Sequence, residues 1–240
     1  MIKEFNDKKI VAWIPHSCTY IPEVSDKLVS DSNLLSDTFV DKLYSFLTNK
    51  ITSDYSRFMV DLERYFDDEK EAMSKVGMGM LYNRHIDGTP FDRSIFGEDD
   101  YFKNYYITKH TILKESIKSV GDGCILLDLH SFNNVPLPCD SVQTMDRPDI
   151  CFGFNEDFTK PSDSVMLYIK EFCKEKYISA KFNNPYSGSM TVGDIGIKYT
   201  SLMIEINKNM YIYNGKFRSD AYKLSHNLKE LIQGITELCK

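Results

Sequence analysis

Two short apolar runs along the chain are each followed by a His-Ser pair. The first run covers residues 10–14 and precedes His16, and the second covers residues 124–129 and leads directly to His130. Short apolar runs bounded by turn-forming residues are typical of strands that are buried on both faces. Ligands and catalytic groups gather at the carboxyl ends of strands in open α/β sheets. The pattern therefore predicts that His16 and His130 lie at one edge of a sheet.

The remaining periodicity predicts strands that alternate with helices. We expect a long ordered loop over residues 65–98 and a turn over 183–189, because both stretches are rich in glycine, proline and polar residues. Alternation of this kind is typical of a three-layer α/β/α sandwich with a mostly parallel, mixed central sheet. With no visible boundary, residues 1–240 are expected to form a single domain. The expected strands are 10–14, 57–64, 124–129, 149–153, 178–182 and 200–206, and the expected helices are 37–49, 99–119, 161–177 and 217–238.

Composition narrows the functional classes. The 240 residues are 42% hydrophobic and 27% charged, with a net charge of -6. An acidic chain is a poor candidate for binding nucleic acid or an anionic membrane. We expect neither a secretory signal nor a membrane-spanning segment. Six scattered cysteines without a Cys-x-x-Cys pair favour reduced thiols and a cytoplasmic location.

His16 and His130 are candidate ligands of one metal ion. A neutral imidazole is the commonest metal ligand, and catalytic zinc usually takes three protein ligands and keeps one position open. The third ligand must be an acid, a histidine or a cysteine. Asp37 is favoured because it would begin the helix that follows the first strand, at the same sheet edge; Asp41 and Cys18 remain alternatives. For either histidine alone, a structural, hydrogen-bonded role is the better interpretation, whereas the two together, each followed by Ser, favour a metal site.

Glu205 stands inside the apolar run at 202–206. A buried carboxylate without a partner is costly, so an acid there indicates a function, and beside a metal it could serve as general base. A strand residue that faces solvent is the alternative. The sequence contains no Gly-x-Gly-x-x-Gly after a strand, no phosphate-binding loop and no Gly-x-Ser-x-Gly elbow, which disfavours nucleotide chemistry and serine hydrolysis.

Four arginines are candidates for binding an anionic substrate, since a guanidinium holds a carboxylate through two parallel hydrogen bonds. Any one of them could instead form a surface ion pair. Arg64 is the strongest candidate because it ends an apolar run. The four are Arg57, Arg64, Arg84 and Arg93.

Several spaced motifs, taken in order, resemble the N-formylglutamate amidohydrolase family over nearly the whole chain. Each motif is weak alone, and the ordered set is fairly specific. They are Ile14-Pro15-His16-Ser17 with Pro22, Asp37 with residues 40–44, residues 56–64, Leu127-Asp128-Leu129-His130-Ser131, residues 184–188, and residues 202–207 with Tyr211.

The resemblance implies a fold similar to that of the zinc carboxypeptidases and zinc-dependent hydrolysis of an amide or formamide bond. It implies that His16 and His130 bind the metal and that Glu205 is the base and proton shuttle. Arg64 would grip a substrate carboxylate, and Arg57 would bind substrate or polarise its carbonyl. Asn184 is counted with the substrate-binding residues.

The chain departs from the family pattern at three positions. Glu63 replaces the usual Asn, Cys18 stands where Gly is common, and Met203 replaces a usual Gln. Glu63 adds negative charge where an anionic substrate would dock.

The leading hypothesis is a zinc-dependent amidohydrolase with one Zn²⁺ per chain, acting on a small anionic N-acyl amino acid such as N-formylglutamate. The alternatives are a carboxypeptidase-like metallopeptidase on short peptides, a catalytically degenerate metal- or ligand-binding domain, and an α/β domain with structural histidines.

Overall fold

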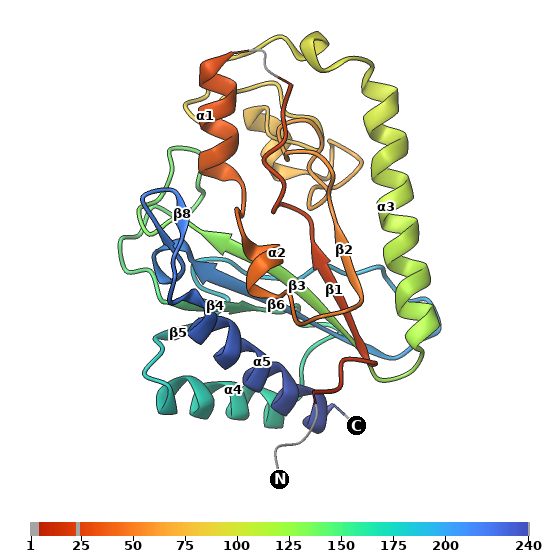
Figure 1. The fold of residues 1–240 in the computed structure, drawn as a ribbon. Coiled ribbons are helices and arrows are strands. Elements are labelled where there is room, and N and C mark those ends of the chain that lie inside the picture. The colour runs from red at the N-terminus through yellow and green to blue at the C-terminus, as the bar shows by residue number, and fades with distance from the viewer. Residues whose placement is uncertain (1–4, 23–24, 240) are drawn as a thin grey trace.

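A six-stranded mixed sheet forms the centre of the protein, which we describe from a computed structural model over residues 5–22 and 25–239 (Figure 1). Four strands run parallel to one another; β4 pairs antiparallel with β6, and β5 runs parallel to β4. The mostly parallel, mixed sheet predicted from the sequence is therefore confirmed. Across the sheet the strands are β2 (Lys50–Thr52), β1 (Ile10–Ile14), β3 (Cys124–Phe132), β6 (Tyr199–Asn207), β4 (Ile150–Gly153) and β5 (Ala180–Phe182).

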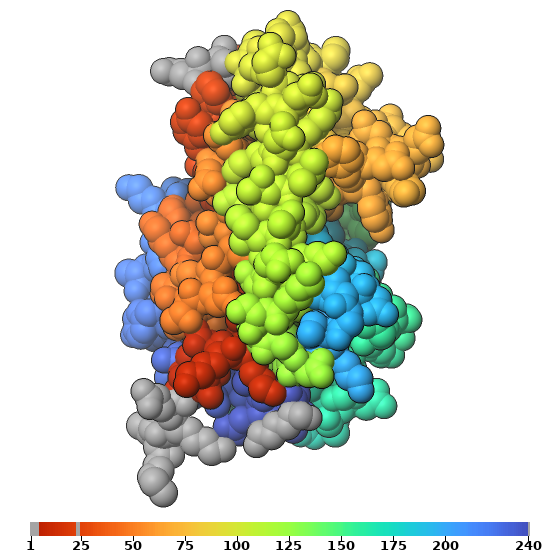
Figure 2. Space-filling model, turned by 90° about the vertical axis from the view of Figure 1, so that its right-hand side faces the viewer, coloured from red at the N-terminus to blue at the C-terminus, as the bar shows by residue number. Residues whose placement is uncertain are grey.

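Helices cover both faces of this sheet. On one face, α4 (Asp163–Glu175) packs against α5 (Ala221–Leu238), and α5 also contacts the short helix α2 (Val40–Leu43). On the other face, α3 (Asp99–Val120) contacts β1, β2 and β3 and runs the length of the molecule (Figure 2). These layers produce two separate hydrophobic cores, one on each side of the sheet.

Strand alternation decides which residues face which core. Successive side chains of a strand point to opposite faces of the sheet. Trp13 of β1 packs in the core on the α3 side, and Asp128 of β3 is its register partner. Two residues further along β3, His130 pairs in register with Glu205 of β6. Asp128, His130 and Glu205 therefore all project toward the α3 side.

The helix expected over residues 37–49 is wrong. Helix α1 (Asp26–Leu35) begins earlier, where the Ser25 hydroxyl accepts a hydrogen bond from the backbone N–H of Leu28. It ends before Asp37, whose backbone N–H donates to the carbonyl of His16 at 2.8 Å. Phe39, with φ of 70°, then separates α1 from α2. The break places the Asp37 side chain next to the loop that follows β1.

The strand expected over residues 57–64 is also wrong. These residues form turns, in which the backbone N–H of Met59 donates to Ser56 and that of Asp61 donates to Met80. The place beside β1 is taken by β2, which the apolar pattern did not reveal because it is only three residues long. Residues 65–98 form the expected long loop, with 3-10 turns at Ala72–Val76 and Arg93–Phe96.

The remaining predicted elements are present with shifted ends. After β6, a 3-10 turn (Lys208–Met210) leads into a small hairpin of β7 (Ile212–Tyr213) and β8 (Lys216–Phe217).

All six cysteines lie in the described residues and are free thiols. In the part of the chain that the structure describes, no helix has the length and apolar character needed to cross a membrane.

Candidate active site

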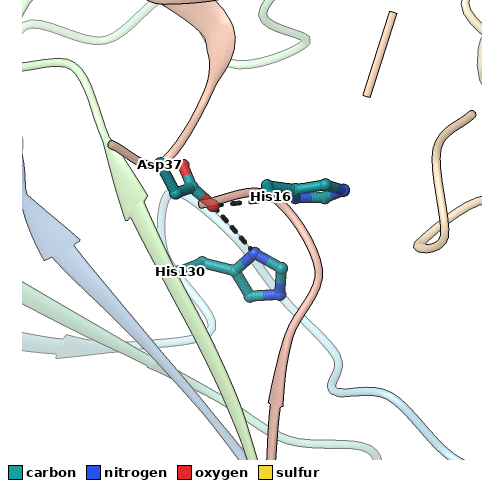
Figure 3. Close-up of side chains that lie close together, drawn as sticks. All are labelled: His16, Asp37 and His130. Atoms are coloured by element: carbon teal, nitrogen blue, oxygen red, sulfur yellow. Dashed lines mark hydrogen bonds and ion pairs between the residues drawn. The ribbon is translucent and has the colours of Figure 1, made fainter. Parts of the chain in front are cut away.

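His16, Asp37 and His130 meet at the carboxyl ends of the central strands (Figure 3). His16 follows β1, Asp37 follows α1, and His130 lies near the end of β3. One oxygen of Asp37, Oδ2, is 3.1 Å from Nδ1 of His130 and 3.6 Å from Nδ1 of His16. All three side chains are buried. The sequence predicted that the two histidines would share a sheet edge, and the structure brings Asp37 to them.

The second nitrogen of each histidine contacts a buried carboxylate. Nε2 of His16 lies 2.8 Å from Asp61, and Nε2 of His130 lies 2.7 Å from Asp128. An ionised carboxylate only accepts hydrogen bonds, so Nε2 of each ring carries a hydrogen, and Nδ1 has a lone pair for a metal when the ring is neutral. Carboxylates behind histidine ligands orient the rings in this way in metal sites.

Nδ1 of His16 is buried and has no hydrogen-bond partner among the described residues. A buried polar atom without a partner is costly, and a bound ion would satisfy it. Two imidazole nitrogens and one carboxylate oxygen are a donor set that suits zinc and leaves a position open. The residues present therefore fit a divalent metal. Asp41 and Cys18, the other candidates for third ligand, belong to no such group in the described residues.

A proton competes with a metal at this position. Burial opposes charge on the His130 ring, but Asp128 and Asp37 outweigh it and raise the pKa of His130 well above its ordinary value. Burial also acts to raise the pKa of Asp37, but the neighbouring rings of His130 and His16 hold that pKa below its usual range. Ser131 adds a hydrogen bond from Oγ to Asp37 at 3.2 Å. Asp37 is thus kept as a carboxylate that can bind a cation.

Glu205 lies beside His130 on the neighbouring strand and faces the same cavity. It is only 9% exposed, so the solvent-facing alternative for this residue is wrong. Its Oε2 atom has no hydrogen-bond partner among the described residues. Burial, opposed by the charge on His130 and helped by the negative charge of Asp37, raises the pKa of Glu205 to about 8. A carboxyl group with a pKa in this range can both take up and release a proton near neutral pH.

Asp61 joins the first histidine to the candidate substrate-binding arginines. Its Oδ2 atom accepts hydrogen bonds from Nε and Nη2 of Arg57, at 3.0 and 2.8 Å, and from the Tyr82 hydroxyl at 2.5 Å. Arg64 approaches Asp61 at 3.8 Å and donates from Nε to the Met78 carbonyl. The terminal Nη atoms of Arg64 have no hydrogen-bond partner in the described part of the chain. Arg64 can therefore still bind a carboxylate.

These residues line one cavity of about 1030 Å³. His16, Asp37 and His130 contribute to its wall, together with Glu205, and other walls come from residues 137–142 and 185–191. A cavity of this size accommodates a small organic molecule with room to spare. Both Arg57 and Arg64 line it.

Three residues expected to bind substrate do not line this cavity. Arg93 has a structural role, because its guanidinium donates hydrogen bonds to the backbone carbonyls of Phe58, Met59 and Tyr82. Arg84 donates to the Gly88 carbonyl within its own loop. Asn184 is exposed in the 183–189 turn, where its neighbours and not its own side chain reach the cavity. The structure therefore does not bring Arg84, Arg93 and Asn184 to the cavity that holds the two histidines.

Sequence reasoning missed four buried polar side chains at the site. Asp61 and Asp128 orient the histidines, Tyr82 holds Asp61, and Lys208 lines the cavity with its ammonium bonded to the Leu34 carbonyl at 2.8 Å. Asp128 was visible as the one acid in the apolar run before His130. Lys208 and Tyr82 gave no local signal, because only the fold brings their segments to the site.

The fold and this polar cavity define an α/β enzyme domain with its site at the carboxyl ends of the strands. The sequence profile described as N-formylglutamate amidohydrolase matches residues 8–212. The chain therefore belongs to the N-formylglutamate amidohydrolase family, as the ordered motifs suggested, and amidohydrolase activity is the activity of that family.

Two solved structures share the fold. One is an N-formylglutamate amidohydrolase from Ralstonia eutropha, with a TM-score of 0.76 and 21% sequence identity over 96% of this chain and 94% of that one. The other is a gene product from Agrobacterium tumefaciens, with a TM-score of 0.61 and 14% identity over 95% of this chain and 90% of that one. Among curated proteins, no match to this sequence is found.

Proposed function

We propose that this protein is a zinc-dependent amidohydrolase that cleaves a small N-acyl amino acid bearing a free carboxylate, such as N-formylglutamate. The observation that carries the proposal is the paired arrangement of His16 and His130. Each presents Nδ1 toward Asp37 and donates from Nε2 to a buried carboxylate. Glu205, with an unpaired oxygen, lies next to them.

One zinc ion per chain would be held by His16, Asp37 and His130. When bound, it would supply a Lewis acid that polarises the substrate carbonyl and makes water more acidic. Glu205 would be stabilised as a carboxylate by a cation at this position, because the two charges attract.

Glu205 is the proposed general base. Its unpaired oxygen would accept a proton from the attacking water and then pass it to the nitrogen of the leaving amine. Arg57 would face the carbonyl oxygen, where positive charge stabilises the transition state. Asp61 and Tyr82 hold Arg57 in place through the hydrogen bonds described above.

Arg64 is proposed to bind the substrate carboxylate. Arg64 lines the same cavity as Glu205. A guanidinium with two parallel N–H groups fixes a carboxylate in position as well as attracting it. Such orientation would place the acyl group of the substrate near Glu205.

The test is a hydrolysis assay with zinc-loaded protein on N-formylglutamate, N-acetylglutamate and short peptides. Glu205→Gln should keep the metal and lose about 10²-fold or more of kcat, since general base catalysis contributes that much. A variant that retains both metal and rate would remove Glu205 as base.

The size of the cavity favours one second candidate, a metallopeptidase that acts on short peptides. A volume of about 1030 Å³ exceeds the needs of a single small amino-acid derivative. Faster cleavage of peptides than of N-acyl amino acids in the same assay would favour this alternative.

A further inference from the structure

Lys208 is a buried lysine that directly follows β6, three residues beyond Glu205. It begins the 3-10 turn, and the Asn207 side chain fixes the start of that turn by accepting a hydrogen bond from the backbone N–H of Asn209 at 3.1 Å. Lys208 is only 9% exposed and lines the same cavity as Glu205. Lysine is almost never buried to this extent without a partner, so the contacts of its ammonium group indicate what it does.

One hydrogen bond occupies only part of the Lys208 ammonium group. Its Nζ atom donates to the Leu34 carbonyl at 2.8 Å, and the Asn133 side chain donates to the same carbonyl at 3.0 Å. This carbonyl belongs to the last turn of α1, where cations are favoured. An ammonium group has three donors, and the other two have no hydrogen-bond partner among the residues that the structure describes. The contact with α1 therefore holds Lys208 in place and leaves two donors for a ligand.

The charge of Lys208 is not balanced by an acid either. Within residues 5–22 and 25–239, no carboxylate forms an ion pair with it. Burial lowers the pKa of Lys208, although the negative charge of Asp37 opposes this effect. A buried charge is costly unless it is paired and hydrogen-bonded. Because Lys208 lines the cavity, an anionic group of a ligand can supply both the missing charge and the missing acceptors.

Lys208 and Arg64 lie on different walls of the cavity. The hydroxyl of Tyr106, in α3, donates to the Arg64 carbonyl at 2.7 Å, whereas Lys208 contacts the end of α1. Figure 1 shows α1 on the left and α3 on the right of the upper part of the molecule. A ligand that uses both cations must therefore carry two anionic groups, one for each wall.

We propose that Lys208 is a specificity-determining residue that binds a carboxylate on the side chain of the substrate, while Arg64 binds the α-carboxylate. Lys208 would then make the site prefer a side-chain carboxylate to an uncharged amide of the same shape. This proposal rests on the proposed amidohydrolase function. Its action is on substrate binding, since Arg57 is the cation assigned to the carbonyl oxygen of the bond that breaks.

The experiment compares ligands of the same shape that differ in this one charge. N-methanesulfonyl-glutamate and N-methanesulfonyl-glutamine, in which a sulfonamide replaces the cleavable amide, are titrated into zinc-loaded protein by calorimetry. Hydrolysis of N-formylglutamate and N-formylglutamine is measured in parallel. We expect the glutamate sulfonamide to bind at least about tenfold more tightly than the glutamine sulfonamide, as hydrogen bonds to a charged group allow. Lys208→Met should bring that ratio close to one, and Lys208→Arg should retain most of it because the charge is kept.

Lys109→Met is the matched control. Lys109 lies outside the cavity, but it is only 16% exposed and donates to the Thr52 carbonyl at 2.8 Å, as Lys208 does to Leu34. Its replacement removes the same charge from the protein and should leave the ratio unchanged. Arg64→Gln should weaken binding of both sulfonamides by a similar factor, because both carry the α-carboxylate. The comparison of the two sulfonamides on the unmodified protein stands even if Lys208→Met fails to fold.

Equal binding of the two sulfonamides to the unmodified protein, or no binding of either, would overturn the role of Lys208. So would a ratio that Lys208→Met leaves unchanged or that Lys109→Met lowers equally. Hydrolysis of the two formyl compounds with equal kcat/KM would overturn this role and leave the amidohydrolase function standing. Tighter binding of the glutamate sulfonamide, lost in Lys208→Met, without hydrolysis of either formyl compound would do the reverse.

Discussion

Replacing Asp61 by asparagine should damage both stability and metal binding, because its two oxygens hold different partners. Oδ1 faces His16 and the backbone N–H of Glu63, and Oδ2 accepts three hydrogen bonds from Arg57 and Tyr82. The side chain is fully buried. Burial acts to raise the pKa of Asp61, but Arg57 and His16 outweigh it and hold the pKa well below its ordinary value. An ionised carboxylate therefore stands at this position.

An asparagine offers only one oxygen, so one set of partners must be lost. If the amide oxygen faces Arg57, the NH₂ group faces His16, whose ring must then accept at Nε2 and carry its hydrogen on Nδ1. That removes the lone pair proposed for the metal, and loss of such a supporting carboxylate typically costs about 10–100-fold in metal affinity. If the oxygen faces His16, Arg57 is left as a buried charge without its partner, which costs about 3–5 kcal/mol.

Two measurements on Asp61→Asn follow from this reasoning. Guanidinium titration of the metal-free protein measures the free energy of unfolding, and competition with a chelator measures the zinc affinity. Either the free energy of unfolding or the zinc affinity should fall, by an amount in the range given above for it. Asp54→Asn is the matched control, since Asp54 also forms an ion pair, with Lys109, but is 67% exposed. Its effect should stay below about 1 kcal/mol. The reasoning is refuted if Asp61→Asn matches the control in both measurements.

Two further predictions concern substrate and pH. Arg64→Gln should raise KM for a carboxylate-bearing substrate about 10–100-fold, as expected for a lost charged hydrogen bond. Arg84 lies outside the cavity, so Arg84→Gln should leave KM unchanged. Equal effects of the two changes on KM would contradict the role of Arg64. Because burial lowers the pKa of His110, the folded protein binds fewer protons than the unfolded chain below about pH 6.5, so acid lowers its stability. The free energy of unfolding is measured with urea at about pH 7.5 and about pH 5. Its fall between the two pH values should be smaller in His110→Asn than in the unmodified protein, and unchanged in the exposed control His226→Asn.

Strands and sheet were largely predictable because their signals are local. The apolar runs before His16 and His130 identify β1 and β3, and each run is completely buried in the structure. The helix expected over residues 37–49 failed for a reason that the sequence hides. Asp37 forms a backbone hydrogen bond to His16, which is distant in sequence, and this contact fixes the break between α1 and α2.

The sequence signal for the site was strongest where a residue adjoins a recognisable strand. His16, His130 and Glu205 have this property, and the structure places all three around one cavity. Arginines in irregular segments do not adjoin a recognisable strand, so the sequence gives no comparable signal for them. Arg64 and Arg93 are indistinguishable by type, yet one faces the cavity and the other donates to three backbone carbonyls. Such differences depend on tertiary contacts of the 65–98 loop, which no local pattern encodes.

Metal content tests the central claim most directly. Purified protein is incubated with zinc, excess ion is removed, and bound metal is measured by elemental analysis for the unmodified chain, for His130→Ala and for the exposed control His226→Ala. The account predicts about one ion per chain, lost in His130→Ala and kept in His226→Ala. A chain that retains no metal under these conditions, or a His130→Ala variant that retains it fully, would contradict the proposal that His16, Asp37 and His130 form a metal site.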